Sequence, residues 1–261
     1  MTGELKRGVC DVLEYFSAMG IDYLPVPQSS IKALSGKQTA AAAGKPAPKP
    51  AAAMAPIPAP SAAAYNPDKE AALKAVREDI GDCQRCALSR ERKNIVFGEG
   101  HPEARIMFIG EAPGREEDIQ ARPFVGEAGQ QLTGLIEKLG FRREDVYIAN
   151  ICKCRPPENR NPEQAETAAC FPFLSEQIRI ISPGVIMSLG KIATYSLMKP
   201  AVPITKFSIL RERGKWFEYN GVPVMPTTHP AYWLRNRNDK HQVWKEAQEA
   251  AAKLRASKGE R

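Results

Sequence analysis

Short apolar segments alternate with amphipathic segments through the second half of this 261-residue chain. Strands that alternate with helices are typical of a parallel sheet whose two faces are both covered. The expected strands lie at 104–110, 145–150, 184–190 and 222–230, and the expected helices at 129–140, 162–181, 191–198 and 241–256. The pattern predicts an α/β fold, a three-layer αβα sandwich with a central four-stranded, mostly parallel sheet.

Polar side chains stand at the ends of three of these predicted strands. Glu111, Asn150 and His229 each lie at, or just after, the end of a different strand. Ligands of open α/β sheets bind beyond the carboxyl ends of the strands. We therefore expect these three side chains to converge on one crevice.

The first part of the chain has a different composition. Residues 40–64 hold 13 Ala and 6 Pro among 25 positions, and the repeated prolines break the helix that Ala alone would favour. We expect residues 26–69 to be a flexible, disordered linker and residues 70–261 to be the folded domain. Residues 1–25 are either a short amphipathic helix that docks onto a protein partner or a tail whose helix forms only transiently.

Composition narrows the class of protein. A hydrophobic share of 43% is enough for a core. Six cysteines, with no apolar leader segment near the start and no apolar run of membrane-spanning length, indicate a reducing compartment, so we expect a cytoplasmic protein without a membrane partner.

A net charge of +7 permits a nucleic-acid partner without requiring one. Nothing in the sequence demands an oligomer, and a monomer is expected.

Four of the six cysteines form two separated pairs. Cys83 and Cys86 have two residues between them, 67 residues separate Cys86 from Cys154, and 15 separate Cys154 from Cys170. By spacing alone, a zinc site with four thiolate ligands and an iron–sulfur cluster fit equally well. The remaining two cysteines are expected to be ordinary small apolar side chains.

Three segments resemble one known family. GEAPGREEDIQARPFVGEAGQ (110–130), NICKCRPPENRNP (150–162) and THPAYWLRN (228–236) are similar, in this order, to motifs of the family 4 uracil-DNA glycosylases, which carry a four-iron, four-sulfur cluster. The resemblance spans about residues 78–250. It implies one [4Fe-4S] cluster whose ligands are Cys83, Cys86, Cys154 and Cys170.

The resemblance also implies a uracil pocket. Asn150 matches the residue that reads uracil, Phe124 the aromatic platform on which the base stacks, and His229 a donor to uracil O2. Other positions that match the family's pocket are Gly110, Ala112, Glu111 and Glu117.

The implied activity is DNA repair: uracil is flipped out of DNA and its N-glycosidic bond is hydrolysed, which yields free uracil and an abasic site. Some relatives outside this family have a water-orienting Asp where this chain has Ala112, so we expect a dissociative path in which Glu111 or Glu117 assists the water. The motifs place no Lys that could form a Schiff base. We therefore expect a monofunctional hydrolase that does not cleave the strand.

The last motif suggests DNA contacts. We expect HPAYWLRNRN to be a loop with an apolar tip, in which Leu234 is the wedge that enters the base stack and Arg235 meets phosphates. Arg155 is a further candidate for a backbone contact. Alternatively, the apolar side chains of this segment close the core beneath the last helix.

Two other classes of protein remain as alternatives. A related group binds uracil-DNA tightly or covalently and carries a basic, His-containing insertion after the second strand, which this sequence lacks. An iron–sulfur redox protein without catalysis would have its cysteines closer together and would leave the pocket motifs without a purpose. A replication or repair factor is the expected partner of residues 1–25.

Overall fold

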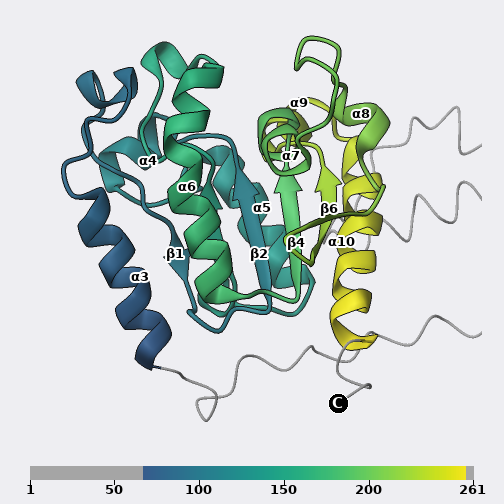
Figure 1. Cartoon of the computed structure of the whole chain (residues 1–261). Coiled ribbons are helices and arrows are strands. Elements are labelled where there is room, and N and C mark those ends of the chain that lie inside the picture. The colour runs from purple at the N-terminus through teal and green to yellow at the C-terminus, as the bar shows by residue number, and fades with distance from the viewer. Residues whose placement is uncertain (1–66, 257–261) are drawn as a thin grey trace, which may run out of the picture. The chain divides into compact units, whose positions relative to one another are not determined.

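The computed structural model describes residues 67–256 of the chain (Figure 1). The helix expected within residues 1–25 and nearly all of the expected linker lie outside these residues. The first described helix, α3 (Pro67–Ile80), spans the predicted domain boundary at residue 70, and that boundary stays a prediction. Within the described residues, no helix combines the length and the apolar character needed to cross a bilayer.

The described residues contain one sheet with the strand order β1-β3-β2-β4-β6-β5. The four inner strands are parallel and lie where the apolar segments predicted them, which confirms the α/β class. The sheet has six strands rather than the four expected, because β1 and β5 pair antiparallel along its edges. These edge strands have two and three residues, too few to show the apolar run that signals a strand. The bounds are β1 (Glu99–Gly100), β2 (Ile106–Gly110), β3 (Tyr147–Asn150), β4 (Val185–Leu189), β5 (Phe217–Tyr219) and β6 (Val222–Thr227).

Helices cover both faces of the sheet, as Figure 1 shows for α6 in front and α5 behind. Every residue of β2 and β4 is buried, as expected for strands covered on both faces. One face packs against α3, α6 (Gln164–Ile181) and α7 (Lys191–Met198). The other packs against α5 (Glu127–Lys138), α9 (Pro230–Arg235) and α10 (Asp239–Ala256). Short helices lie in the connections: η2 (Ala87–Arg90), α4 (Arg115–Gln120), η3 (Arg143–Asp145), η4 (Pro157–Asn159) and α8 (Ile209–Glu212).

The register of the parallel strands aligns their carboxyl ends. Gly110 at the end of β2 pairs with Asn150 at the end of β3, and Leu189 at the end of β4 pairs with Thr227 at the end of β6. The residues that follow β2 and β6 therefore emerge at the same edge of the sheet as Asn150.

The segment after β6 differs from the expectation. The predicted strand over 222–230 ends at Thr227, because His229 is the N-cap of α9 and Pro230 occupies the first helical turn. The expected loop with an apolar tip is thus a short helix. Trp233 packs into the core, whereas Leu234 stays 38% exposed, so only part of the tip faces outward.

The packing of α5 can be tested at Leu132, which is fully buried on the helix face that meets the sheet. We predict that Leu132→Ala lowers the free energy of unfolding by about 2–5 kcal/mol, because it removes buried methyl groups and leaves a cavity. Urea denaturation measures the change. Leu210→Ala on α8, where the side chain is 56% exposed, should change it by no more than about 0.5 kcal/mol. Equal losses in the two variants would contradict this assignment of the core.

Candidate functional site

One pocket opens beyond the carboxyl ends of β2, β3 and β6. Its walls come from the loop after β2, the start of α5, the segment after β3 and the first turn of α9. Arg155 and Leu234 do not line it, and Gly110 lies directly behind it. The predicted site residues that the structure brings together here are Glu111, Ala112, Glu117, Phe124, Asn150, His229 and Arg235.

Asn150 presents an unsatisfied amide to this pocket. The residue is buried at the end of β3, yet neither its Nδ2 nor its Oδ1 has a hydrogen-bond partner among the described residues. A buried polar group without a partner costs about 1–3 kcal/mol. An arrangement that leaves both atoms of one amide unpaired is typical of a site that receives a ligand with a complementary donor and acceptor.

Gly110 allows Asn150 and Phe124 to approach the same point. A Cβ atom at position 110 would lie 2.4 Å from Asn150 Oδ1 and 2.4 Å from Phe124 Cζ. Any side chain there would push the amide or the ring out of place. Glycine suits this pocket position because the side chains of Asn150 and Phe124 both come close to it.

Phe124 is held in a strained backbone conformation, with φ at 51°. Gly129 of α5 makes room for it, because a Cβ there would lie 1.9 Å from the Phe124 carbonyl oxygen. Arg143 donates a hydrogen bond from Nη2 to the carbonyl oxygen of Pro123. As a result, the Phe124 ring faces the pocket at 5.7 Å from the His229 ring, centroid to centroid.

Glu117 fixes the two loops on either side of Phe124. The backbone N–H groups of Val125 and Gly126 donate to its Oε1 (2.8 and 2.9 Å), and that of Gly114 donates to its Oε2 (3.1 Å). Both carboxylate oxygens are therefore engaged in holding the backbone.

Glu111 is the other carboxylate of the pocket. No hydrogen bond from the described residues occupies its side chain, so none competes with a ligand. Burial raises its pKa to about 7, since the ionised form is poorly solvated there. Near neutral pH the group therefore exists in both protonation states, which suits proton transfer.

His229 is neutral at physiological pH. Burial lowers its pKa to about 4, and the nearby negative charge of Glu117 opposes this shift only in part. Its Nδ1 accepts a hydrogen bond from the backbone N–H of Ala231 at 3.2 Å, so the ring proton resides on Nε2. The imidazole can thus donate from Nε2 without carrying a charge.

A buried ionic network beneath His229 was not foreseen from the sequence. Arg213 pairs with Glu246 (Nε–Oε1, 2.7 Å) and with Asp239. The hydroxyl groups of Thr227 and Thr228 donate to Glu246 and Asp239, each at 2.6 Å. Because these threonines immediately precede His229, the network fixes the backbone from which the imidazole projects. The partners come from widely separated segments, so local sequence gave no signal.

Two further charged side chains of these segments are engaged in hydrogen bonds within the protein. Asp118, in the acid-rich run after β2, is buried and accepts hydrogen bonds from the backbone N–H groups of Lys93 and Asn94 (2.9 and 3.1 Å). Arg160 lines the pocket mouth while its guanidinium is held by Glu166 through two hydrogen bonds of 2.8 and 2.7 Å.

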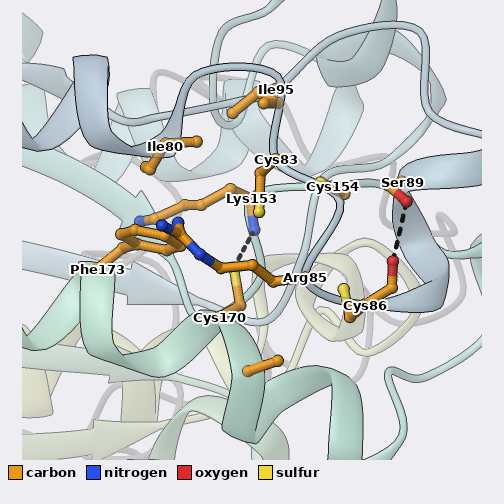
Figure 2. A pocket seen from close by; sticks show the side chains of 11 residues that line it. Ile80, Cys83, Arg85, Cys86, Ser89, Ile95, Lys153, Cys154, Cys170 and Phe173 are labelled. Atoms are coloured by element: carbon orange, nitrogen blue, oxygen red, sulfur yellow. Dashed lines mark hydrogen bonds between the residues drawn. The ribbon is translucent and has the colours of Figure 1, made fainter.

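The four cysteines singled out by their spacing line a second, smaller pocket, shown in Figure 2. They come from three segments: Cys83 and Cys86 follow α3, Cys154 follows β3, and Cys170 lies on α6. The walls are otherwise mostly apolar, and the Arg85 guanidinium lies 4.6 Å from the ring centroid of Phe173. No disulfide joins any two of the five described cysteines.

The donor atoms around this pocket determine what it can bind. Within residues 67–256, no three or more His, Cys, Asp or Glu side chains are arranged to hold a single metal ion. The donor set nevertheless fits a larger anionic assembly. The Arg92 side chain is almost completely buried beside it. Its Nη2 pairs with Asp82 Oδ1 at 2.6 Å, whereas its Nη1 has no hydrogen-bond partner among the described residues, and its charge acts on Cys154. Burial raises the pKa of Cys154 to about 12, so this thiol keeps its proton until a cation displaces it.

Cys152, expected to be an ordinary apolar side chain, is buried next to this pocket. Its thiol donates to Cys170. This hydrogen bond and the positive charge of Lys153 together lower the pKa of Cys170 to about 7. The Lys153 side chain is itself buried, and its Nζ donates to the carbonyl oxygen of Asn150 (3.0 Å) and to Oε1 of Gln177 (2.6 Å).

The raised pKa of Glu111 predicts how the stability of the protein depends on pH. Its folded-state value of about 7 lies above its ordinary value of 4.5, so folding favours the protonated form. The stabilising contribution is complete below about pH 4.5 and is lost as the pH rises through 7. We predict that the parent loses at least about 1 kcal/mol of unfolding free energy relative to Glu111→Gln between pH 5 and pH 8. Urea denaturation at each pH measures the difference, and a difference that stays constant would contradict the raised pKa.

Comparison with known proteins shows the family of this chain. The model of the uracil DNA glycosylase superfamily matches residues 97–252. The type-4 uracil-DNA glycosylase of Thermotoga maritima is 48% identical over 172 residues, which cover 66% of this chain and 88% of that protein. That of Saccharolobus solfataricus is 48% identical over 169 residues, covering 63% and 78%. The type-5 enzyme of Pyrobaculum aerophilum is 30% identical over 147 residues, covering 51% and 63%. This chain therefore belongs to the uracil DNA glycosylase superfamily and, within it, to the type-4 family.

Proposed function

We propose that this protein is a uracil-DNA glycosylase of base excision repair. It takes uracil out of the DNA stack and hydrolyses the N-glycosidic bond, which leaves free uracil and an abasic site. The observation that carries the proposal is the buried, unpaired amide of Asn150 at the floor of a pocket that also holds an aromatic ring and a neutral imidazole.

The amide of Asn150 matches the edge of uracil. Its Nδ2 can donate to uracil O4 while its Oδ1 accepts from uracil N3–H. Cytosine presents an amino donor and an unprotonated ring nitrogen at the same two places, so the same orientation leaves both contacts repulsive. Phe124 supplies the face on which the base stacks, a contribution of about 1–3 kcal/mol for aromatic platforms.

His229 stabilises the leaving group. As the C–N bond breaks, negative charge builds up on uracil, and the Nε2–H of a neutral His229 donates to O2. A donor that is already in place costs no reorganisation at that moment, and removal of one such donor typically lowers kcat by about 10²–10³. The Thr227 and Thr228 contacts hold the imidazole at this position.

Glu111 is our choice for the carboxylate that assists water. Ala112 offers no acid at the position where some relatives have Asp, and both oxygens of Glu117 already accept backbone hydrogen bonds. We propose that water adds to the oxocarbenium-like sugar after the bond has broken and gives its proton to ionised Glu111. Glu117 is then a positioning residue for Phe124.

Contacts to DNA surround the pocket mouth. Leu234 is exposed on α9 next to Arg235, which lines the pocket. We propose that Leu234 enters the gap left by the flipped nucleotide while Arg235 meets a phosphate. Arg155 does not line the pocket, but it donates at 2.8 Å to Oδ1 of Asn159, which does, and we assign it a role in the outer DNA contacts.

We propose that Cys83, Cys86, Cys154 and Cys170 hold one [4Fe-4S] cluster. Four thiols from three segments of the chain, with the buried charge of Arg92 beside them, suit an anionic cluster better than a single ion. When bound, the cluster supplies a covalent tie between these segments. The cytoplasmic location, the monomeric state and a repair partner for residues 1–25 stay predictions.

The activity can be tested directly. Purified protein incubated with duplex DNA that contains uracil should release free uracil and leave alkali-labile abasic sites. We predict that His229→Ala lowers kcat by about 10²–10³ and that Asn150→Ala largely abolishes uracil release, whereas His241→Ala on the exposed face of α10 keeps the parent rate. Absence of free uracil from the parent itself would overturn the proposed activity.

The cluster has its own test. We predict a brown protein with broad visible absorbance and about four irons per chain, since thiolate-to-iron charge transfer absorbs visible light. Cys154→Ser should lower the iron content, and Cys10→Ser should leave it unchanged. Colourless protein with stoichiometric zinc would contradict the assignment.

A further inference from the structure

A buried lysine links the two pockets. Lys153 lies between Cys152 and Cys154, and its side chain is 1% exposed. Its backbone N–H donates to the Sγ of Cys170 at 3.2 Å, which is drawn in Figure 2. Its Nζ reaches the other way and donates to the carbonyl oxygen of Asn150 at 3.0 Å.

The same Nζ is anchored to α6. It donates to Oε1 of Gln177 at 2.6 Å, and the Nε2 of Gln177 donates to the carbonyl oxygen of Phe97 (3.0 Å) and to the hydroxyl of Tyr147 (3.1 Å). Gln177 is fully buried, and its hydrogen bonds to Lys153 and Tyr147 are buried as well. The end of β3 is thus tied to the helix that carries Cys170.

The charge of Lys153 also needs compensation. An ammonium group in the interior is costly unless an anion or several acceptors lie close by. Among the described residues, no carboxylate forms an ion pair with Lys153, and its electrostatic neighbours are Cys170 and Cys152. The contacts that meet this ammonium group are therefore its two acceptors, the carbonyl oxygen of Asn150 and Oε1 of Gln177.

We infer that Lys153 is a positioning residue for uracil recognition, which holds the peptide of Asn150 so that its amide meets the base. The inference rests on the proposed function, because it assigns Asn150 to the reading of uracil. The amide of Asn150 has no hydrogen bond of its own within the protein, so its direction depends on the backbone beneath it. The contact from Lys153 Nζ to the Asn150 carbonyl oxygen fixes that backbone from below.

The test measures uracil-specific binding rather than activity alone. The measured quantity is the ratio of the dissociation constants for uracil-free duplex and for the same duplex with one 2′-fluoro-deoxyuridine, whose glycosidic bond resists hydrolysis. Lys153→Met keeps the length of the side chain and removes its donors. We expect this ratio to fall about tenfold in Lys153→Met, the usual size of a lost charged hydrogen bond, while affinity for uracil-free duplex stays the same.

A double-mutant cycle shows whether Lys153 acts through Asn150. In the Asn150→Ala background, Lys153→Met should lower the ratio no further. An equal loss in both backgrounds, or an unchanged ratio in the single variant, would overturn the inference. Visible absorbance and thermal midpoint are recorded for every variant, and a purely structural role would move these without moving the ratio.

Gln177→Leu gives a second route if Lys153→Met does not fold. It removes the other anchor of Nζ, so we expect a smaller fall in the same ratio with the cysteine site intact, and an unchanged ratio would again overturn the inference.

Uracil release and duplex preference of the parent protein show which of the two proposals has failed. If the parent neither releases uracil nor prefers uracil-containing duplex, the proposed function fails. If the parent does both and the variants keep its ratio, only the role of Lys153 fails.

Discussion

The site depends on the in-register pairing of parallel strands. Because β2 and β3 end side by side, with Gly110 paired to Asn150, the residues after β2 and the amide at the end of β3 face the same space. A shift by one residue would turn the Asn150 side chain to the opposite face of the sheet. The strands are buried on both faces, so the pocket takes its geometry from the core rather than from its loops alone.

Around this edge, burial changes the hydrogen bonding or the pKa of three polar groups. Asn150 has an unpaired amide, His229 is neutral, and Glu111 titrates near pH 7. Each state has the same physical cause, which is burial in a pocket that supplies few partners. The surrounding contacts are fully satisfied, such as those of Glu117 and of Arg213, and they offset the unfavourable free energy of these states. At this site the Asn150 amide has no protein partner and His229 keeps one backbone contact, from Ala231, whereas the carboxylate of Glu117 that supports the pocket is paired through both oxygens.

Sequence alone predicted the inner strands, because each is an apolar run long enough to recognise, and it placed Glu111, Asn150 and His229 at strand ends. It failed where partners are distant. Asp118 looks like one acid in a solvated turn, yet it is buried by contacts to residues some 25 positions earlier. Nothing in the motif around Lys153 indicates that its side chain lies inside the fold. The edge strands were missed because so short a segment carries no periodicity, and the helix after His229 was missed because a capping histidine before proline also suits the end of a strand.

The segment that carries Cys83 and Cys86 belongs to no inner strand, and stability need not be uniform across a fold. Such a peripheral unit can open by itself while the sheet stays folded, unless something ties it down. The proposed iron–sulfur cluster would tie it, through Cys83 and Cys86, to the segments that carry Cys154 and Cys170. The same segment is hydrogen-bonded at Lys93 and Asn94 to Asp118 on α4, the helix that also bears Glu117 and so supports Phe124. A cofactor that takes no part in bond cleavage would thereby set how often the uracil pocket is intact.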